Sequence, residues 1–217
     1  MTDQTAPLRI DIVSDIVCPW CVIGYRQLAK ALERTGIAHE IHWHPFELNP
    51  DMPPEGQNLS EHLAEKYGST PAQSAENRAR ITTFGSEVGF EFRFAEDMRM
   101  HNTFNAHQLL HWAKGQGRMH DLKQALFAAH FTDRRDLSDA DVLADVASGT
   151  GLDRAEALAV LRDQRFASDV RQQQNFWLRQ GISGVPAVVF DNTYLVTGAQ
   201  GVEAYAGMLR QIMEKAA

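Results

Sequence analysis

The stretch "SDIVCPWCVIG", residues 14–24, contains the only two cysteines of this chain, Cys18 and Cys21. Residues 8–13, "LRIDIV", alternate and are rich in β-branched side chains, which predicts a strand directly before the stretch. Residues 22–36, "VIGYRQLAKALERTG", place apolar side chains at helical spacing and end in a glycine, the usual C-terminal cap. The cysteines are therefore predicted where a strand meets a helix.

The rest of the chain extends this pattern outward. We expect a second strand at 39–48, consecutive helices over about 58–180, a β-hairpin of 186–190 and 194–196, and a closing helix at 202–215. This order predicts an α/β protein: a thioredoxin fold interrupted by an all-helical insertion domain. The predicted boundaries are 1–55 and 150–217 for the thioredoxin-like domain and 56–149 for the insertion.

Four residue patterns predict where helices begin. Each places a side chain that can cap the first turn before a residue that can complete the cap. The predicted capping residues are Asn58, Thr70, Ser138 and Asp153.

Composition and charge limit the class of protein. Of the 217 residues, 44% are hydrophobic and 23% charged, as in ordinary globular proteins. The net charge of −7 argues against a nucleic-acid partner, because phosphate binding needs a clustered positive surface. No apolar run approaches the ~20 residues of a membrane span, and the first residues do not resemble a secretory signal. We therefore expect a cytosolic protein.

A cytosolic location bears on the two cysteines. In a reducing compartment a C-x-x-C pair is more often catalytic or metal-binding than a structural disulfide. A structural zinc site needs four ligands, and the sequence offers no third cysteine. The one promising histidine pair, His107 and His111, has Gln108 where the zinc-protease pattern has glutamate. We therefore predict no metal and a redox pair, with two incidental apolar cysteines as the remaining alternative.

The position of the pair at a helix start predicts unequal thiols. Cys18 would lie beside unpaired backbone N–H groups and the positive end of the helix dipole, which stabilise a thiolate and lower its pKa. Pro19 suits the first turn because it has no N–H to leave unsatisfied. Cys21, one turn on, would face inward and attack the mixed disulfide that Cys18 forms. We expect Cys18 to be accessible to solvent and Cys21 to be shielded.

A second motif supports a site at this end of the sheet. "SGVPAVVF" places Val185–Pro186 where the first strand of the hairpin starts, a position that tolerates proline. A cis bond there would mark a constrained turn, and an ordinary trans proline is the alternative.

Several segments together resemble one family. They are "DIVCPWCVIG", "HPFELNP", "HNTFNAHQLL", "GVPAVVFD" and "TGAQ", in this order along nearly the whole chain. They are similar to the DsbA-type thioredoxin-like oxidoreductases, and most similar to the FrnE-like branch with its C-P-W-C centre. The resemblance implies a nucleophile at Cys18, a resolving thiol at Cys21, a substrate-binding cis-proline loop at Val185–Pro186, and no cofactor beyond the disulfide.

The chain departs from this family at two positions. The acidic residue expected six places before the first cysteine is Ile12, and Asp15, which is nearer the cysteines, is the alternative acid. Trp20 stands where DsbA proteins have histidine. The direction of the redox reaction therefore does not transfer. His101 and His107 are expected to be satisfied polar groups rather than catalysts.

Other functions stay open beside the redox hypothesis. The same interrupted fold resembles 2-hydroxychromene-2-carboxylate isomerases and kappa-class glutathione transferases, which would make the chain a glutathione-dependent isomerase or transferase. Those families have serine at the first position of the motif, so Cys18 favours a thiol–disulfide oxidoreductase. A non-enzymatic binding module would leave the thiols idle. The expected partners are protein or small-molecule thiols and disulfides, with glutathione a candidate, and neither nucleic acid nor membrane.

Overall fold

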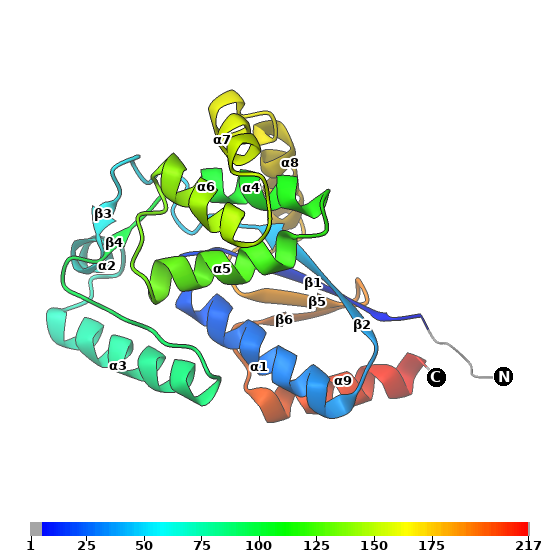
Figure 1. Cartoon of the computed structure of the whole chain (residues 1–217). Helices are drawn as coiled ribbons and strands as arrows, with labels where there is room; N and C mark the ends of the chain where they lie inside the picture. Colours follow the sequence, from blue (N-terminus) through cyan, green and yellow to red (C-terminus); the bar gives the residue numbers. More distant parts are fainter. Residues whose placement is uncertain (1–5, 217) are drawn as a thin grey trace.

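A computed structural model describes residues 6–216 of the protein. Its central sheet has the order β2-β1-β5-β6 (Figure 1). β1 (Leu8–Ser14) pairs in parallel with β2 (His39–Pro45) and antiparallel with β5 (Ala187–Phe190), which pairs antiparallel with β6 (Tyr194–Thr197). A strand, a helix and a parallel strand followed by a hairpin and a helix confirm the predicted α/β thioredoxin fold. The second strand ends at Pro45, three residues earlier than predicted.

Two helices cover one face of the sheet. α1 (Pro19–Thr35) and α9 (Val202–Ala216) pack side by side (Figure 1). α1 ends at Gly36, whose φ of 64° lies in the left-handed region, as the sequence predicts for a helix cap. The core between these helices and the sheet is apolar, because side chains such as Ile10 and Leu28 are fully buried.

The long middle of the chain is mainly helical. In Figure 1 helices α4 to α8 form a layer on the opposite side of the sheet from α9, and α2 and α3 stand at one end of the sheet, beside the start of α1. Two short strands there, β3 (Gln57–Asn58) and β4 (Arg99–Met100), pair antiparallel and were not predicted. The division into domains at residues 56 and 149 stays a prediction. The helices are α2 (Leu59–Tyr67), α3 (Pro71–Glu87), α4 (Phe104–Lys114), α5 (Met119–Phe131), α6 (Ala140–Gly149), α7 (Arg154–Asp163) and α8 (Ala167–Arg179).

Three of the four predicted helix caps are confirmed. Asn58, Thr70 and Asp153 each accept hydrogen bonds from backbone N–H groups of the following turn. The prediction for Ser138 is wrong by one residue, because Asp139 caps α6. The backbone N–H and hydroxyl of Ser138 instead bond to an aspartate two residues earlier.

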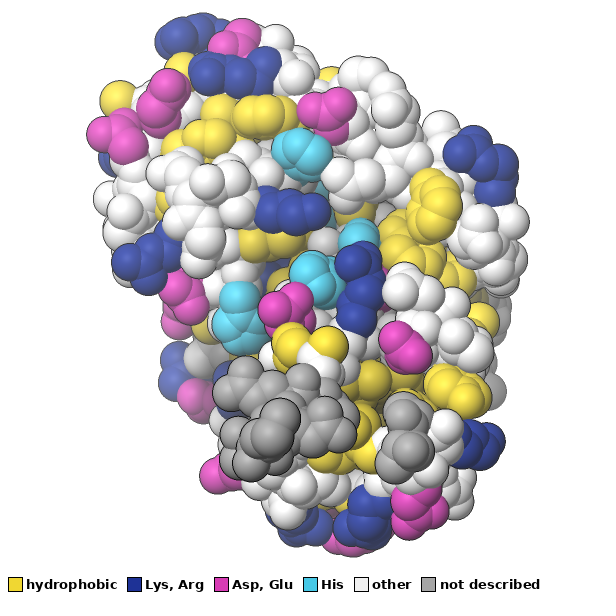
Figure 2. Space-filling view, turned by 90° about the vertical axis from the view of Figure 1, so that its right-hand side faces the viewer, with side chains coloured by type: hydrophobic (Ala, Val, Ile, Leu, Met, Phe, Trp, Pro, Cys, Tyr) yellow, Lys and Arg dark blue, Asp and Glu magenta, His cyan; other side chains and the backbone are white. Residues whose placement is uncertain are grey.

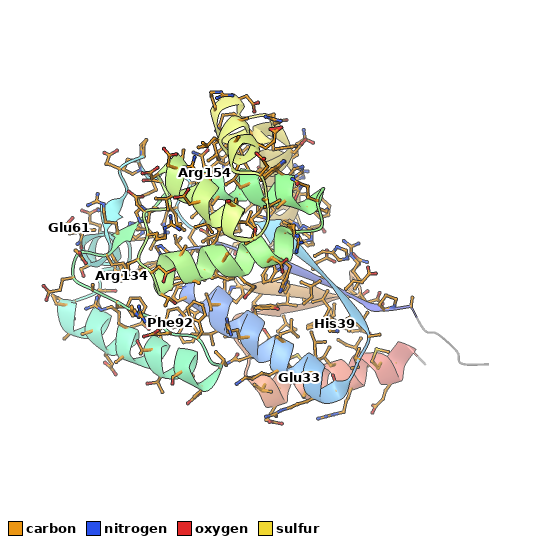
Figure 3. The ribbon with its side chains drawn as sticks, viewed as in Figure 1. Glu33, His39, Glu61, Phe92, Arg134 and Arg154 are labelled. Carbon is orange, nitrogen blue, oxygen red and sulfur yellow. The ribbon has the colours of Figure 1, made fainter. Side chains whose placement is uncertain are left out.

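An aromatic contact fixes α3 against the loop that follows it. Gly85 of α3 touches Phe92, and a Cβ at that position would lie 2.4 Å from a carbon of the ring. Phe92, labelled in Figure 3, packs edge-on against Phe131 of α5 with ring centroids 5.0 Å apart. The absence of a side chain at Gly85 therefore allows α3 to approach the rest of the protein closely.

The surface mixes charges of both signs. On the face shown in Figure 2, acidic and basic side chains are interspersed, and several histidines gather near the middle. Within residues 6–216, no helix combines the length and the apolar character that crossing a membrane requires.

Candidate active site

The two cysteines lie at the first turn of α1. Cys18 is the N-cap residue, Pro19 is the first helical residue, and the N–H of Cys21 donates to the carbonyl of Cys18 at 3.1 Å. Both thiols are free. Only 3% of Cys18 and 1% of Cys21 is exposed. Cys21 is shielded as expected, but the expectation that Cys18 is accessible to bulk solvent is wrong. Its sulfur lines an internal cavity, and the walls of that cavity cover it.

The surroundings of Cys18 also contradict the predicted lowering of its pKa. Burial raises the pKa of the Cys18 thiol well above its ordinary value, and the neighbouring Cys21 thiol and Asp15 carboxylate raise it further. The N–H of Cys21 acts in the opposite direction. In the unliganded protein, desolvation therefore outweighs the helix terminus, and a thiolate at Cys18 needs a further source of positive charge.

The proline loop lies against both Cys18 and α1. The Val185–Pro186 peptide bond is cis. The Cys18 thiol donates a hydrogen bond to the carbonyl of Val185, with 3.7 Å between sulfur and oxygen. On the other side, a Cβ at Gly24 would lie 3.3 Å from the Cγ of Pro186, so a small residue in α1 permits this packing. The structure thus brings Cys18, Val185 and Pro186 together.

Behind the cysteines lies a buried carboxylate. Asp15 is fully buried and accepts hydrogen bonds from the N–H of Leu48 at 2.7 Å and from His107 Nε2 at 3.4 Å. Burial opposes ionisation of Asp15, but the hydrogen bonds, led by that from His107, outweigh it and hold the pKa of this carboxyl below its ordinary value. His107 Nε2 also donates to the carbonyl of Phe46 at 2.9 Å, which confirms its expected role as a satisfied polar group.

A buried lysine lies near the same carboxylate and both thiols. Lys123 of α5 is only 1% exposed, and its Nζ lies 5.0 Å from the centroid of Phe127 and 5.5 Å from that of Trp43. Its single hydrogen bond runs to the carbonyl of Ser14 at 3.4 Å. Burial lowers the pKa of Lys123 to about 8, while attraction to Cys21, and less strongly to Asp15 and Cys18, acts to raise it. This ammonium group is the positive charge nearest to hand for a thiolate.

The sequence analysis missed Lys123 and underrated Asp15. Ile12, where the family has its acid, is buried in the core and brings no charge. A signal for Lys123 is present in the sequence, because it lies three and four residues before Leu126 and Phe127, on the apolar face of its helix. A lysine at such a position is either misplaced or held there by a buried partner.

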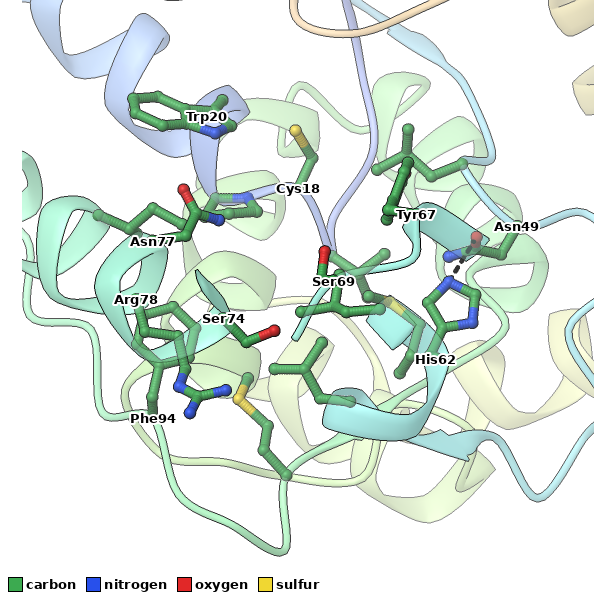
Figure 4. Close-up of a pocket in the computed structure, with 18 of the residues that line it drawn as sticks. Cys18, Trp20, Asn49, His62, Tyr67, Ser69, Ser74, Asn77, Arg78 and Phe94 are labelled. Atoms are coloured by element: carbon green, nitrogen blue, oxygen red, sulfur yellow. Dashed lines mark hydrogen bonds between the residues drawn. The ribbon is translucent and has the colours of Figure 1, made fainter. Parts of the chain in front are cut away.

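A cavity of about 610 Å³ opens beside Cys18. Figure 4 shows Cys18 and Trp20 on one side of it and Ser74 and Arg78 of α3 on another, with Ser69 between them. Trp20 packs against Phe84, with ring centroids 5.7 Å apart. Of the segment resembling the family at 44–50, Asn49 lines the cavity. Within residues 6–216, no group of three His, Cys, Asp or Glu side chains is arranged to hold a metal ion.

Comparisons with known proteins agree with this architecture. The crystal structure of a "probable DsbA oxidoreductase" from Streptomyces coelicolor is 34% identical, has a TM-score of 0.88, and is matched over 94% of this chain and 89% of that one. The cytosolic disulfide reductase DsbM from Pseudomonas aeruginosa with GSH has 17% identity, a TM-score of 0.65, and coverage of 95% and 99%. A 2-hydroxychromene-2-carboxylate isomerase has 14% identity, a TM-score of 0.68, and coverage of 96% and 95%.

The last two similarities concern the fold alone, because their identities are low. A family model gives the more specific result, since the DSBA-like thioredoxin domain matches residues 9–210, which include the cysteine pair, the helical middle and the proline loop. The chain belongs to the DSBA-like thioredoxin domain family.

Proposed function

We propose that the protein is a cytosolic thiol–disulfide oxidoreductase of the FrnE-like branch, with C-P-W-C as its redox centre. The observation that carries this proposal is the position of the Cys18 sulfur. It lies at the start of α1, against the carbonyl of Val185 and on the wall of a cavity, with Cys21 one helical turn further on. A substrate sulfur that enters the cavity can therefore meet Cys18 before Cys21.

In the reducing direction, the Cys18 thiolate attacks one sulfur of a substrate disulfide. A bond forms between Cys18 and that sulfur, the substrate S–S bond breaks, and the other substrate sulfur leaves as a thiolate that takes up a proton. Cys21, once deprotonated, then attacks the Cys18 sulfur, forms the Cys18–Cys21 disulfide and releases the second substrate thiol. The protein dithiol loses two electrons and two protons, and the substrate disulfide gains them. The reverse sequence oxidises substrate thiols.

Buried charge supplies what the helix terminus alone does not. Lys123 stabilises negative charge on either thiol, because burial strengthens the attraction between unlike charges. Asp15 acts in the opposite sense on Cys18 and holds the ammonium of Lys123 in its charged form. Together they take the place of the acid that is missing at Ile12.

The substrates in this proposal are protein or small-molecule disulfides and thiols, with glutathione among them. The backbone of Val185–Pro186 would align an extended substrate beside Cys18. Two observations support a thiol substrate: the family of the chain, and the likeness of its fold to a cytosolic disulfide reductase whose structure contains GSH.

The test is to incubate the reduced protein anaerobically with oxidised glutathione and to measure both products. We expect the mass of the protein to fall by two hydrogens while two glutathione thiols appear. Cys18→Ser should leave oxidised glutathione unchanged. A glutathione-dependent isomerase or transferase would bind glutathione with both of its own thiols still reduced, and that result would contradict the proposal.

A further inference from the structure

The cavity beside Cys18 has the size of a small-molecule site. Its volume of about 610 Å³ falls within the roughly 300–1,000 Å³ typical of ligand pockets. The walls come from two parts of the chain: the start of α1 and the proline loop on one side, and α2, α3 and β4 on the other. A ligand inside would therefore touch both the redox centre and the helical middle of the protein.

The inner wall is apolar. Leu59, Ile81, Met98, Met100 and Phe131 line it, and each is buried. Flexible methionine side chains adapt to ligands of different shape. The wall fits an aromatic or aliphatic body better than a strongly hydrated one.

Arg78 is the exception in this lining. Among the lining residues that the structure describes there is no aspartate, glutamate or lysine, so Arg78 carries the one permanent charge. Burial lowers the pKa of His62, and it lowers that of His130 to about 3, so both imidazoles are neutral near pH 7. Lys66 lies nearby but outside the lining, and its ammonium donates to the carbonyl of Leu48 and to Asn49 Oδ1.

The guanidinium of Arg78 is partly buried and unpaired. Within residues 6–216 its side chain forms neither an ion pair nor a hydrogen bond. Arg80, two residues along the same helix, instead donates to Asn77 and lies 5.4 Å from the centroid of Trp20. Arg78 shares the cavity wall with Ser74 and Asn77 of α3, which offer further polar atoms (Figure 4). A guanidinium with five donors and no partner is suited to a planar carboxylate.

We propose that this cavity binds a small disulfide or thiol that has an apolar body and a carboxylate, with Arg78 pairing the carboxylate while the ligand sulfur reacts at Cys18. The inference rests on the proposed function, since it assigns a substrate class to the same redox centre. Each turnover follows the exchange already described: the protein dithiol reduces one disulfide to two thiols and becomes the Cys18–Cys21 disulfide.

Two chromogenic aromatic disulfides test the role of Arg78. 5,5′-Dithiobis(2-nitrobenzoic acid) has a carboxylate on each ring, and 4,4′-dithiodipyridine has none. The reduced protein is mixed with each probe over a range of concentrations, and thiol release is followed by absorbance. We expect Arg78→Gln to raise the half-saturating concentration of the dicarboxylate about tenfold, the factor expected for one charge-assisted hydrogen bond, and to leave the limiting rate unchanged.

The neutral probe and a second arginine provide the controls. With 4,4′-dithiodipyridine, Arg78→Gln should behave like the wild type to within about twofold, and Arg78→Lys should retain part of the preference for the dicarboxylate. Arg80→Gln removes an equal charge from the same helix and should leave the ratio between the probes unchanged. Thermal unfolding should be the same for the wild type and Arg78→Gln, because Arg78 has no partner to lose.

Two outcomes would overturn the inference in different ways. If Arg78→Gln and Arg80→Gln change the ratio between the probes equally, or if Arg78→Gln lowers only the limiting rate, Arg78 does not bind the carboxylate. If the wild type reacts with neither probe, the proposed function itself is wrong, and the assignment of a substrate class fails with it.

Discussion

The two sides of the cysteine pair differ in how they treat charge. On the cavity side, Cys18 meets apolar walls, a neutral Trp20 and one unpaired guanidinium. On the buried side, Asp15 and Lys123 are enclosed together, with little access to water. The difference separates two tasks. The open side can accept a ligand without an existing ion pair to break, while the closed side holds fixed charges that act on the thiols.

The closed side reduces the stability of the fold. Lowering the pKa of Lys123 from 10.5 to about 8 corresponds to roughly 3 kcal/mol of folding free energy, because the unfolded chain solvates the ammonium freely. A methionine would fill the same space between Trp43 and Phe127 without that cost. Positions at which a protein keeps a destabilising group are often functional sites.

The largest expected effect separates the two cysteines themselves. Cys21→Ser should accumulate mixed disulfides with substrate, because nothing remains to attack the Cys18 sulfur, whereas Cys18→Ser should form none. Non-reducing electrophoresis and mass spectrometry after incubation with oxidised glutathione measure both. Equal trapping by the two variants would mean that either thiol can meet the substrate, and the distinction between an open and a closed side would be lost.

Replacing the buried lysine should stabilise the fold and weaken the oxidant. We expect Lys123→Met to raise the free energy of unfolding by about 2 kcal/mol and to lower the reduction potential of the cysteine pair by some tens of millivolts, since about 30 mV corresponds to each pKa unit lost in thiolate stabilisation. Denaturant unfolding and a glutathione redox titration measure the two quantities. Lys114→Met, at an exposed position in α4, is the matched control and should change neither.

The pH dependence of stability tests the same residue independently. Because the folded-state pKa of Lys123 is depressed, the folded protein loses this proton near pH 8 while the unfolded chain keeps it to about pH 10.5. Between these values the unfolded state binds more protons, so the contribution of Lys123 to stability rises with pH. The difference in unfolding free energy between Lys123→Met and the wild type should shrink from pH 8 to pH 10.5. A constant difference would show that Lys123 is not charged when buried.

Replacing the buried carboxylate should shift the potential in the opposite direction. Asp15→Asn removes a negative charge that raises the pKa of Cys18, so the thiolate becomes more stable and the reduction potential rises, again by some tens of millivolts. The variant should lose about 1–2 kcal/mol of stability with its charge-assisted hydrogen bonds. Asp11→Asn is a suitable control, because Asp11 pairs with Arg9 and His44. If both variants leave the potential unchanged, Asp15 is a structural residue only.

The smallest expected effect concerns the open side. Trp20→His would place an imidazole next to Cys18, where a cation or donor lowers the thiol pKa and raises the potential by at most a few tens of millivolts. The nearby guanidinium of Arg80 limits the gain, because it disfavours a protonated histidine. Thiolate absorbance against pH measures the change. No change in pKa or potential would mean that the closed side alone sets the redox properties.

The sequence predicted the parts of this site that depend on local pattern. The strand before Cys18, the helix that begins at Pro19 and the glycine at its end follow from periodicity and capping, and all are confirmed. The two-residue strands β3 and β4 are too short to produce a periodic signal.

The parts that depend on tertiary packing could not be predicted. The pKa of Cys18 was expected to fall because a helix start favours a thiolate, but the expectation omitted the walls contributed by α2 and α3, which remove water from the sulfur. Asp15 and Lys123 come from distant parts of the chain and meet only once α5 packs beside β1 and β2. Arg78 sits in a largely polar helix whose pattern gives no sign that one arginine faces a cavity.

The central claim is that Cys18 and Cys21 form one redox couple. The direct measurement is equilibration of the protein in glutathione buffers of graded potential, followed by differential alkylation and mass spectrometry of the two cysteines. The account predicts a single cooperative two-electron transition in which both thiols are lost together, with a midpoint below the about −120 mV of DsbA because Cys18 is not strongly stabilised as a thiolate. Independent titration of the two cysteines, or stable glutathione adducts without an intramolecular disulfide, would contradict it.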